Sequence, residues 1–315
     1  MNDSVVAIVV TYNRRELLQE CLEAILLQTH SVEKVIVINN CSTDDTERLF
    51  MPGEKYDQPI IEFYTTEKNI GGSGGFEKGF ELADKTNCDW IWVMDDDAIP
   101  FPDTLEELIK ARKAISEEKV GFIASAVYGM NGEPMNVPVL DRKKDANGYE
   151  DWYRYSEFGL IKIRSATFVS LLIPHEAVKE LGYPIKEFFI WGDDTEYTRR
   201  LSTYYGDSYL CGKSKIIHKR ANAKSLSILN EEDKHRVGMY HYYYRNSLLT
   251  AHKYNPKGNS ALHVCEFHLL ALKCLFKPGV NNRWIKFVTL ERGIFEYLFG
   301  SVNIKSKLDR INSKV

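Results

Sequence analysis

Short apolar runs rich in β-branched residues alternate with helix-period segments along the first half of the chain. Between the first two runs, apolar residues recur every three or four positions from Leu17 to Leu26, which predicts a helix with one apolar face. A second helix is expected at about residues 103–116, after Pro100 and Pro102. The expected strands are Val5–Val10, Lys34–Asn39, Ile60–Tyr64, Trp90–Met94 and Gly121–Val127. This alternation is typical of an α/β domain, so we expect a mostly parallel central sheet with helices on its faces.

The alternation weakens in the second half of the chain. Residues 128–160 are rich in Gly, Asn, Pro and charge, and we interpret this long irregular segment as a substrate loop that binds the acceptor. A buried strand is expected at Ala166–Ile173, and beyond Asn230 the pattern is helical, with breaks near Pro256 and Pro278. We therefore predict an α/β domain over residues 1–225 and a C-terminal helical region over residues 226–315. The helical region is a candidate for contact with a membrane or with a second copy of the chain.

Composition places the chain among ordinary globular proteins, with 44% hydrophobic and 27% charged residues over 315 positions. Its cysteines form no C-x-x-C pair, and the first apolar run reads as a strand rather than as a signal peptide. We therefore expect free thiols and a cytoplasmic location. No apolar segment approaches the roughly 18 residues that a membrane span needs.

Charge is uneven along the chain. From Ala251 to the end there are eleven Lys and Arg residues against four Asp and Glu, while the whole chain has a formal net charge of −3. Because basic residues dominate only in this tail, a nucleic-acid-binding role is not expected. A basic helical tail suggests docking on an anionic membrane surface, at the inner face of the cell membrane, although a solvated helical face would look similar.

The sharpest chemical signal is the run Asp95, Asp96 and Asp97 directly after an apolar strand. In an open α/β sheet, the carboxyl ends of the strands line the ligand crevice. Because side chains alternate along an extended chain, we expect Asp95 and Asp97 to point to one side and Asp96 to the other. Two such carboxylates can share Mg²⁺ or Mn²⁺ with the phosphates of a nucleotide substrate. A solvated acidic turn is the alternative interpretation.

A glycine-rich segment, Asn69–Phe76, opens a further expected helix. Backbone amides at such a helix start can approach phosphate or sugar oxygens closely. The segment matches neither the dinucleotide-binding fingerprint nor the P-loop. A tight strand-to-helix turn would use the same glycines, so both interpretations stay open.

Several segments, taken in order, resemble the family 2 glycosyltransferases of GT-A fold, and most closely the bacterial galactofuranosyltransferases and rhamnosyltransferases. These segments are Val9–Arg14, Ile38–Asp44, Asn69–Phe76, Asp95–Asp97 and Trp191–Glu196. The resemblance covers about Val5–Arg220, and the later run Tyr242–Asn246 also looks like that branch. The combination is specific for the fold and the reaction type, and much less specific for the sugar.

The resemblance implies a nucleotide-diphosphate sugar as donor. The residues that it assigns to the donor are Thr11, Tyr12, Asn13, Arg14, Asn40, Asp44, Asn69, Gly72, Asp95 and Asp96. Tyr12 is expected near the base. Many relatives carry an Asp where this chain has Asn39 or Asn40, so base or ribose recognition is expected to differ in detail.

For the chemistry, the resemblance implies that Asp95, Asp97 and His218 hold Mn²⁺ or Mg²⁺. A lone histidine after an apolar strand is often structural, which is the alternative for His218. Asp194 is the candidate base that takes the proton from the acceptor hydroxyl, and Asp193 is a second catalytic candidate. Both acids at the start of a helix would also suit capping. The expected acceptor contacts are Trp191, Asp193 and Glu196.

Together these features predict an inverting glycosyltransferase of bacterial surface glycan synthesis. It would transfer galactofuranose from UDP-galactofuranose to a hydroxyl of a polysaccharide or a lipid-linked saccharide. A rhamnosyltransferase using dTDP-rhamnose is the enzyme alternative, and a non-catalytic nucleotide-sugar-binding scaffold is the alternative of another class. A pure scaffold has no need for a metal site together with a base, which argues against it.

Overall fold

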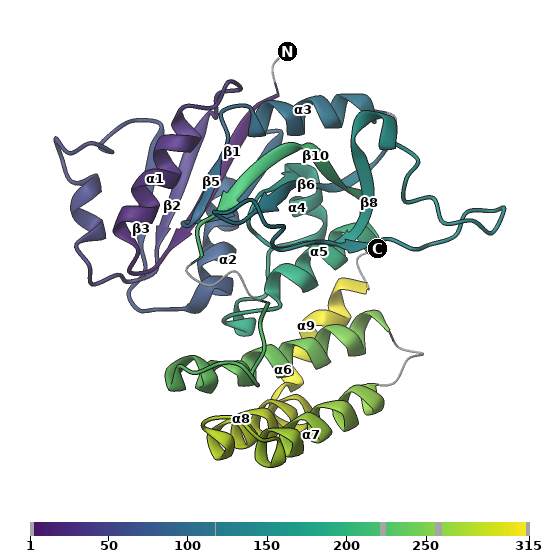
Figure 1. Cartoon of the computed structure of the whole chain (residues 1–315). Helices are drawn as coiled ribbons and strands as arrows, with labels where there is room; N and C mark the ends of the chain where they lie inside the picture. Colours follow the sequence, from purple (N-terminus) through teal and green to yellow (C-terminus); the bar gives the residue numbers. More distant parts are fainter. Residues whose placement is uncertain (1–2, 117, 221–224, 256–259, 313–315) are drawn as a thin grey trace. The chain divides into compact units, whose positions relative to one another are not determined.

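The computed structural model describes residues 3–116, 118–220, 225–255 and 260–312, and its contacts divide the chain into two units (Figure 1). The sheet unit comprises Met1–Lys186 and Asp194–Ala223, and the helical unit comprises Glu187–Asp193 and Lys224–Val315. The short segment Glu187–Asp193 therefore groups with helices that follow it much later in the chain, which the sequence did not lead us to expect. The predicted boundary after residue 225 lies beside residues 221–224, which are outside the described residues.

The sheet unit is built on one sheet with the strand order β3-β2-β1-β4-β9-β6-β10-β8-β7, and β5 pairs with β10. Its first four strands are parallel: β3 (Ile61–Thr65), β2 (Lys34–Asn39), β1 (Val5–Thr11) and β4 (Trp90–Asp95). They confirm four of the expected strands. Beyond β4 the sheet is mixed, because β9 (Leu171–Pro174) runs antiparallel between β4 and β6 (Val120–Tyr128).

The long strand β10 (Asp207–His218) runs parallel to β6 and antiparallel to β8 (Leu160–Ser165) and to β5 (Ala98–Pro100), and β8 also pairs with β7 (Val139–Leu140). The single strand expected at Ala166–Ile173 is wrong in extent, because β8 ends at Ser165 and β9 begins at Leu171. Between them, the amide of Val169 donates to the carbonyl oxygen of Thr167 at 2.8 Å. This tight turn takes the intervening residues out of the sheet.

Helices cover both faces of the sheet. On one face, α1 (Arg15–Leu26) and α3 (Thr104–Ala114) pack against the odd-numbered residues of β1, which are Val5, Ala7 and Val9. On the other face, the even-numbered residues Val6, Ile8 and Val10 meet α2 (Gly71–Ala83), α4 (His175–Leu181) and α5 (Asp193–Tyr204). Because side chains alternate along a strand, one strand contributes to both cores. The expected helices near Leu17–Leu26 and residues 103–116 are confirmed.

The helical unit contains α6 (Lys234–Tyr254), α7 (Ser260–Phe276), α8 (Arg283–Phe295), the π-helical turn η4 (Glu296–Gly300) and α9 (Val302–Asn312). Its core includes Tyr240 and Tyr244 of α6 with Leu290 of α8. The break expected near Pro278 separates α7 from α8, while the one near Pro256 lies outside the described residues. Among the described helices, none has the length and apolar character needed to cross a membrane.

Candidate active site

The three consecutive aspartates lie where β4 ends, next to the end of β1. The two strands pair in parallel with Val10 opposite Asp95, so the last residue of β1 and the turn that follows it reach the acids. Thr11 Oγ1 donates to Asp96 Oδ2 at 2.7 Å. Arg14 Nη1 donates to Asp96 Oδ1 at 3.1 Å and to Asp97 Oδ2 at 2.6 Å. The structure thus brings together Val9–Arg14 and Asp95–Asp97, two of the segments that carry the resemblance, around one group of carboxylates.

Asp95, Asp97 and His218 offer ligand atoms that all lie within 4.8 Å of one another. The antiparallel pairing of β10 with β5 sets His218 opposite Ala98, which brings the imidazole beside the acids. His218 Nε2 is 2.9 Å from Asp97 Oδ1, and both side chains are buried. Two carboxylates and one imidazole fit a divalent cation, and the imidazole suits Mn²⁺ better than Mg²⁺ because Mg²⁺ prefers oxygen ligands.

Asn136 is a residue of this group that sequence reasoning missed. His218 Nδ1 donates to its Oδ1 at 2.9 Å, so Nε2 is the ring nitrogen turned toward Asp97. A second partner of this kind commonly fixes the orientation of a metal-binding histidine. Asn136 is separated from His218 by 82 positions and lies in the irregular segment after β6. Its left-handed backbone, with φ of 46°, is typical of turn asparagines and would not have identified it as a partner of His218.

The three carboxylates differ in their electrostatic environment. Burial raises the pKa of Asp95 well above its usual range, and the charges of Asp97 and Asp96 raise it further, against the opposing effect of Arg14. Burial raises the pKa of Asp96 to about 6, although Arg14 and Thr11 act to lower it. Burial acts in the same direction on Asp97, but hydrogen bonding from His218 and the charge of Arg14 outweigh it, so the pKa of Asp97 is lowered. Arg14 is therefore the main positive charge set against this buried acidic group.

Hydrogen bonds connect the turn after β1 to the loop after β2. The resemblance assigns residues of both segments to the donor, which requires them to lie close together. The amide of Asn13 donates to Ser42 Oγ at 2.9 Å, and its side-chain oxygen accepts from the amide of Thr43 at 2.7 Å. Tyr12, in the same turn, is 45% exposed and available to a ligand. Asp44 accepts from the amide of Arg15 at 3.0 Å, where α1 begins. Asp44 therefore also holds the start of that helix.

Asn40 and Asn69 hold the glycine-rich segment. The side-chain amide of Asn40 donates to Asn69 Oδ1 at 3.1 Å and to the carbonyl oxygen of Gly71 at 3.0 Å. Asn69 Oδ1 also accepts from the amide of Gly71 at 2.8 Å. Gly72 lies in the first turn of α2, with no heavy atom within 4 Å of the position where a Cβ would stand. Gly75 and Gly79, by contrast, pack directly on Val10 and Ile8 of β1.

The acids of α5 have different surroundings. Asp194 is partly buried, and its Oδ1 accepts from the amide of Thr195 at 2.6 Å. Its charge contributes to the raised pKa of Asp95, after burial and the charges of the other two aspartates. Glu196 is fully buried and pairs with Arg200, whose Nε donates to Glu196 Oε1 at 3.2 Å. We therefore leave Glu196 out of the acceptor site that we propose below.

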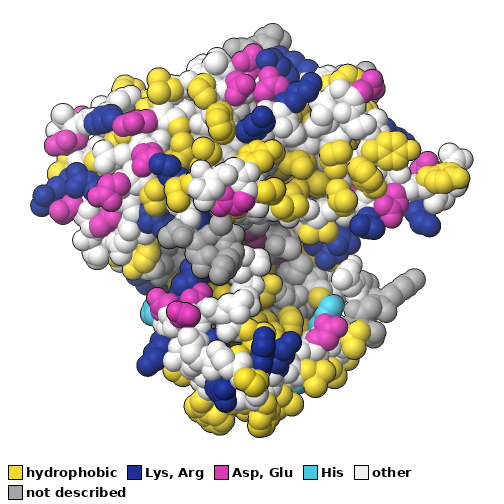
Figure 2. Space-filling model, viewed as in Figure 1, with side chains coloured by type: hydrophobic (Ala, Val, Ile, Leu, Met, Phe, Trp, Pro, Cys, Tyr) yellow, Lys and Arg dark blue, Asp and Glu magenta, His cyan; other side chains and the backbone are white. Residues whose placement is uncertain are grey.

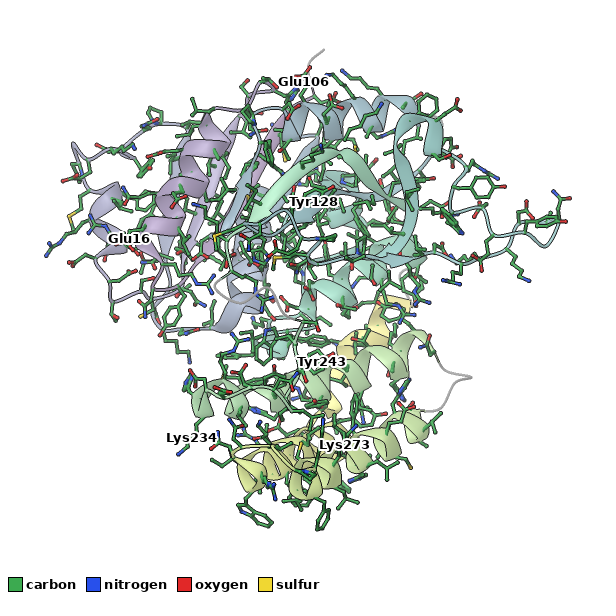
Figure 3. The ribbon with its side chains drawn as sticks, in the orientation of Figure 1. Glu16, Glu106, Tyr128, Lys234, Tyr243 and Lys273 are labelled. Carbon is green, nitrogen blue, oxygen red and sulfur yellow. The ribbon has the colours of Figure 1, made fainter. Side chains whose placement is uncertain are left out.

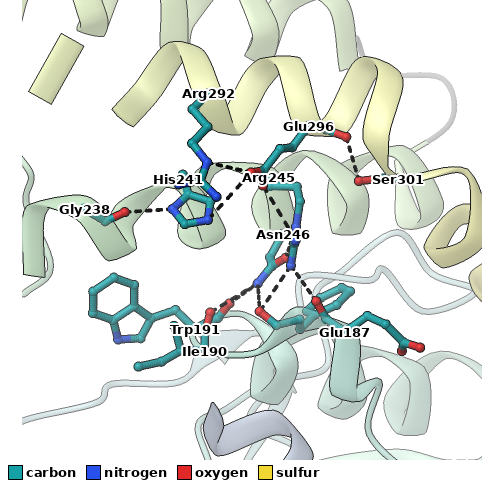
Figure 4. A network of polar contacts seen from close by, with 11 residues as sticks. Glu187, Ile190, Trp191, Gly238, His241, Arg245, Asn246, Arg292, Glu296 and Ser301 are labelled. Carbon is teal, nitrogen blue, oxygen red and sulfur yellow. Dashed lines mark hydrogen bonds and ion pairs between the residues drawn. The ribbon is translucent and has the colours of Figure 1, made fainter. Parts of the chain in front are cut away.

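The segment Glu187–Asp193, which leads into α5 and includes its first residue, belongs to the helical unit, where Asn246 fixes its course (Figure 4). The side-chain amide of Asn246 donates to the carbonyl oxygens of Phe188, Ile190 and Trp191, at 2.9, 3.2 and 2.7 Å. These bonds provide donors for backbone carbonyl groups of an irregular segment, in which Phe189, Trp191 and Gly192 all have positive φ. The indole of Trp191 lies 4.9 Å from the ring of Tyr240. Asp193, the last residue of this segment, is 7% exposed.

The model of the family described as glycosyl transferase family 2 matches residues 6–225. The chain belongs to this family. Its residues 95–97 and 218 thus lie inside the matched region, as do the turn after β1 and the glycine-rich segment.

Curated relatives include two proteins named galactofuranosyltransferase GlfT1. The one from Mycobacterium tuberculosis is 36% identical over 208 residues, which are 64% of this chain and 65% of the relative. The one from Mycolicibacterium smegmatis is 29% identical over 203 residues, 62% of this chain and 65% of the relative. In each case the match spans just under two thirds of the relative's length.

Among solved structures, GalNAc-T7 with UDP, GalNAc and Mn²⁺ is similar with a TM-score of 0.60 at 11% sequence identity, over 96% of this chain and 57% of the other. At this identity the likeness concerns the fold. The fold is the GT-A glycosyltransferase fold, a mixed α/β fold with a central sheet, here accompanied by a C-terminal helical region.

Proposed function

We propose that this protein is a metal-dependent, inverting galactofuranosyltransferase of bacterial surface glycan synthesis. The observation that carries the proposal is the group formed by Asp95 and Asp97 at the end of β4 and His218 at the end of β10. The charge of Asp194 acts on this group by raising the pKa of Asp95. The curated relatives named galactofuranosyltransferase support the choice of sugar. The acceptor in this proposal is a hydroxyl of a glycan or of a lipid-linked saccharide, and residues 1–225 form the catalytic domain.

In the proposed site, Asp95, Asp97 and His218 would hold the divalent cation, with Asn136 orienting the imidazole. A divalent cation held there would supply positive charge against a diphosphate leaving group, which would then need no proton. Arg14 already neutralises part of the acidic charge through Asp96 and Asp97. Because it binds Asp97, one of the proposed cation ligands, Arg14 is also the proposed contact for a donor phosphate.

Asp194 is the proposed general base. A single displacement at the anomeric carbon inverts its configuration and needs one base to take the proton of the attacking hydroxyl. Asp194 lies at the start of α5 and is partly buried, which supports this role. Trp191 and Asp193, which directly precede it, are the proposed acceptor contacts. The exposed ring of Tyr12 is the proposed contact for the base of the nucleotide.

The first experiment measures nucleotide release by the purified protein from UDP-galactofuranose and from dTDP-rhamnose, with and without Mn²⁺, with membrane extract as the source of acceptor. We expect Mn²⁺-dependent release of UDP that is lost in Asp194→Asn. Release of dTDP alone would replace galactofuranose by rhamnose. Donor binding without release of either nucleotide would favour the scaffold alternative.

A second experiment measures Mn²⁺ binding directly by electron paramagnetic resonance. We expect His218→Ala and Asp97→Asn each to weaken Mn²⁺ binding about tenfold or more, because each removes one ligand. Asp194→Asn is the matched control, since it removes an acid of the same site that is not a proposed ligand. Equal Mn²⁺ affinity in all three variants would contradict the proposed ligand set without bearing on the identity of the donor.

A further inference from the structure

Helix α7 carries an exposed apolar stripe. Its members recur at intervals of three and four residues and therefore share one side of the helix. They are Leu262, Cys265, Leu269, Leu272 and Phe276. Phe276 is 76% exposed, whereas Ala271 and Cys274 on the opposite side are buried in the core of the helical unit. The helix is thus apolar on two opposite sides, and its inner side alone packs against the described residues of the unit.

A second stripe runs along α8 and continues through η4 to the start of α9. Its members are Trp284, Ile285, Val288, Phe295, Leu298, Phe299 and Val302. Trp284 is 66% and Phe299 67% exposed, while Leu290 and Ile294 on the inner side are buried. We call the two stripes together the apolar edge. Hydrophobic side chains gather along this edge of the helical unit, over α7 and α8 (Figure 2).

The apolar edge is more than the scattered exposure that all proteins show. Half of the exposed large hydrophobic residues in the described part of the chain fall within residues 262–302. Exposed apolar side chains concentrated in this way mark a site of interaction with another protein or with a membrane. The packing of α7 on α8 places both stripes in one small unit, so a single partner can cover them.

Charge around the apolar edge distinguishes between these partners. Lys273, Lys277 and Arg283 are exposed at the facing ends of α7 and α8, and Lys273 is seen on α7 in Figure 3. None of the ion pairs formed by the described residues includes any of these three. Glu266 and Glu291, acids of the same two helices, are hydrogen-bonded to His263 and His268. The edge therefore combines bulky apolar side chains with cations that lack an acidic partner.

We propose that the apolar edge docks the protein on a lipid bilayer whose surface carries anionic head groups. Aromatic and aliphatic side chains enter the boundary between head groups and acyl chains, and the cations meet the negative surface. A second copy of the chain would instead bring its own lysines and arginine to the same edge, where like charges repel. This inference goes beyond the proposed reaction and does not depend on it.

The test is cosedimentation of the full-length protein with vesicles of phosphatidylcholine, with and without phosphatidylglycerol. We expect binding to vesicles that contain phosphatidylglycerol and weaker binding to phosphatidylcholine alone. Phe295→Ser with Phe299→Ser is expected to weaken vesicle binding about tenfold or more, because both rings leave the interface. Lys273→Gln with Lys277→Gln is expected to weaken it about fivefold per charge, and only when phosphatidylglycerol is present.

Leu27→Ser with Met51→Ser is the matched control, because both residues are exposed and apolar but belong to the sheet unit. It is expected to bind vesicles as the unchanged protein does. Circular dichroism checks that all variants stay folded. Absence of vesicle binding, or binding that the phenylalanine variant does not weaken, overturns the proposal. A dimer in light scattering that the same variant abolishes, without vesicle binding, would assign the edge to a second copy instead.

Discussion

Replacing Gly79 with alanine is expected to destabilise the sheet unit, because this glycine lets α2 lie directly on β1. A Cβ at this position would stand 2.4 Å from Ile8 Cγ2 and 3.5 Å from Ile38 Cγ1. Carbon atoms in contact prefer about 3.5–4.0 Å, so the contact with Ile8 falls short by about 1 Å. Ile8 and Ile38 are both fully buried in the sheet. The neighbours have little room to move.

The size of the effect follows from two opposing contributions. Overpacking of a closed core costs about 1–3 kcal/mol, and the β-branched, rotationally stiff Ile8 places this site in the upper part of that range. Alanine also favours a helix over glycine by about 1 kcal/mol. We therefore expect Gly79→Ala to lower the free energy of unfolding by about 1–2 kcal/mol.

The measurement is urea-induced unfolding followed by circular dichroism, with Gly72→Ala as the control. Gly72 lies in the same helix, but nothing stands within 4 Å of its Cβ position, so that variant is expected to be neutral or slightly stabilising. Ile8→Ala combined with Gly79→Ala should be less unstable than the two single changes predict by addition, since the new methyl group then finds space. A Gly79→Ala protein as stable as Gly72→Ala would refute the close packing described here.

Two further changes test other parts of the sheet unit. Arg200→Met should lower the free energy of unfolding by about 3–5 kcal/mol, because it removes the buried cation that pairs with Glu196. A second change, Glu196→Leu, should recover much of this loss in the same unfolding assay, and full additivity of the two changes would contradict the pairing. Burial acts to raise the pKa of Asp84, but hydrogen bonds from Tyr183 and His175 lower it more, so the pKa lies below its usual value. The resulting stabilisation is present above about pH 4 and is lost as the pH falls through the folded pKa. In thermal unfolding, the stability difference between the unchanged protein and Asp84→Asn should therefore shrink below about pH 4. A difference that grows on acidification would show that the carboxylate is not stabilised in this way.

The parallel half of the fold could be predicted because its signals are local. Each strand is a short apolar run, and parallel strands end at the same edge of a sheet. The acids at the end of β4 were therefore expected to line the edge where the parallel strands end, and the contact between Thr11, at the end of β1, and Asp96 lies at this edge. The alternation of side chains also predicted that Asp95 and Asp97 would share a side, and ligand atoms of both lie near His218. It placed Asp96 on the other side, but Asp96 and Asp97 accept from the same Arg14 nitrogen, because the strand ends at Asp95 and a turn follows.

The rest depended on partners that no local pattern reveals. Asn136 and His218 are separated by 82 positions, and Asn246 lies 55 positions after Trp191. A single asparagine forms no periodic pattern in the sequence, so sequence reasoning could not assign a partner to Asn136 or to Asn246. The strand expected at Ala166–Ile173 began too early and β8 was missed for a related reason, because the turn between β8 and β9 is made by apolar and hydroxyl residues rather than by glycine or proline.

The glycine-rich segment had two open interpretations, and its glycines differ in their surroundings. As a sequence it allowed either a phosphate-binding helix start or a tight turn. In the structure, Gly72 stays open at the first turn of α2, whereas Gly75 packs on Val10 and Gly79 on Ile8. Val10 pairs with Asp95, so the packing of α2 also positions the strand end from which the acids extend. A substitution at Gly75 or Gly79 that lowers activity should therefore be examined for stability first, whereas a substitution at Gly72 tests the proposed donor contact without placing an atom against the sheet.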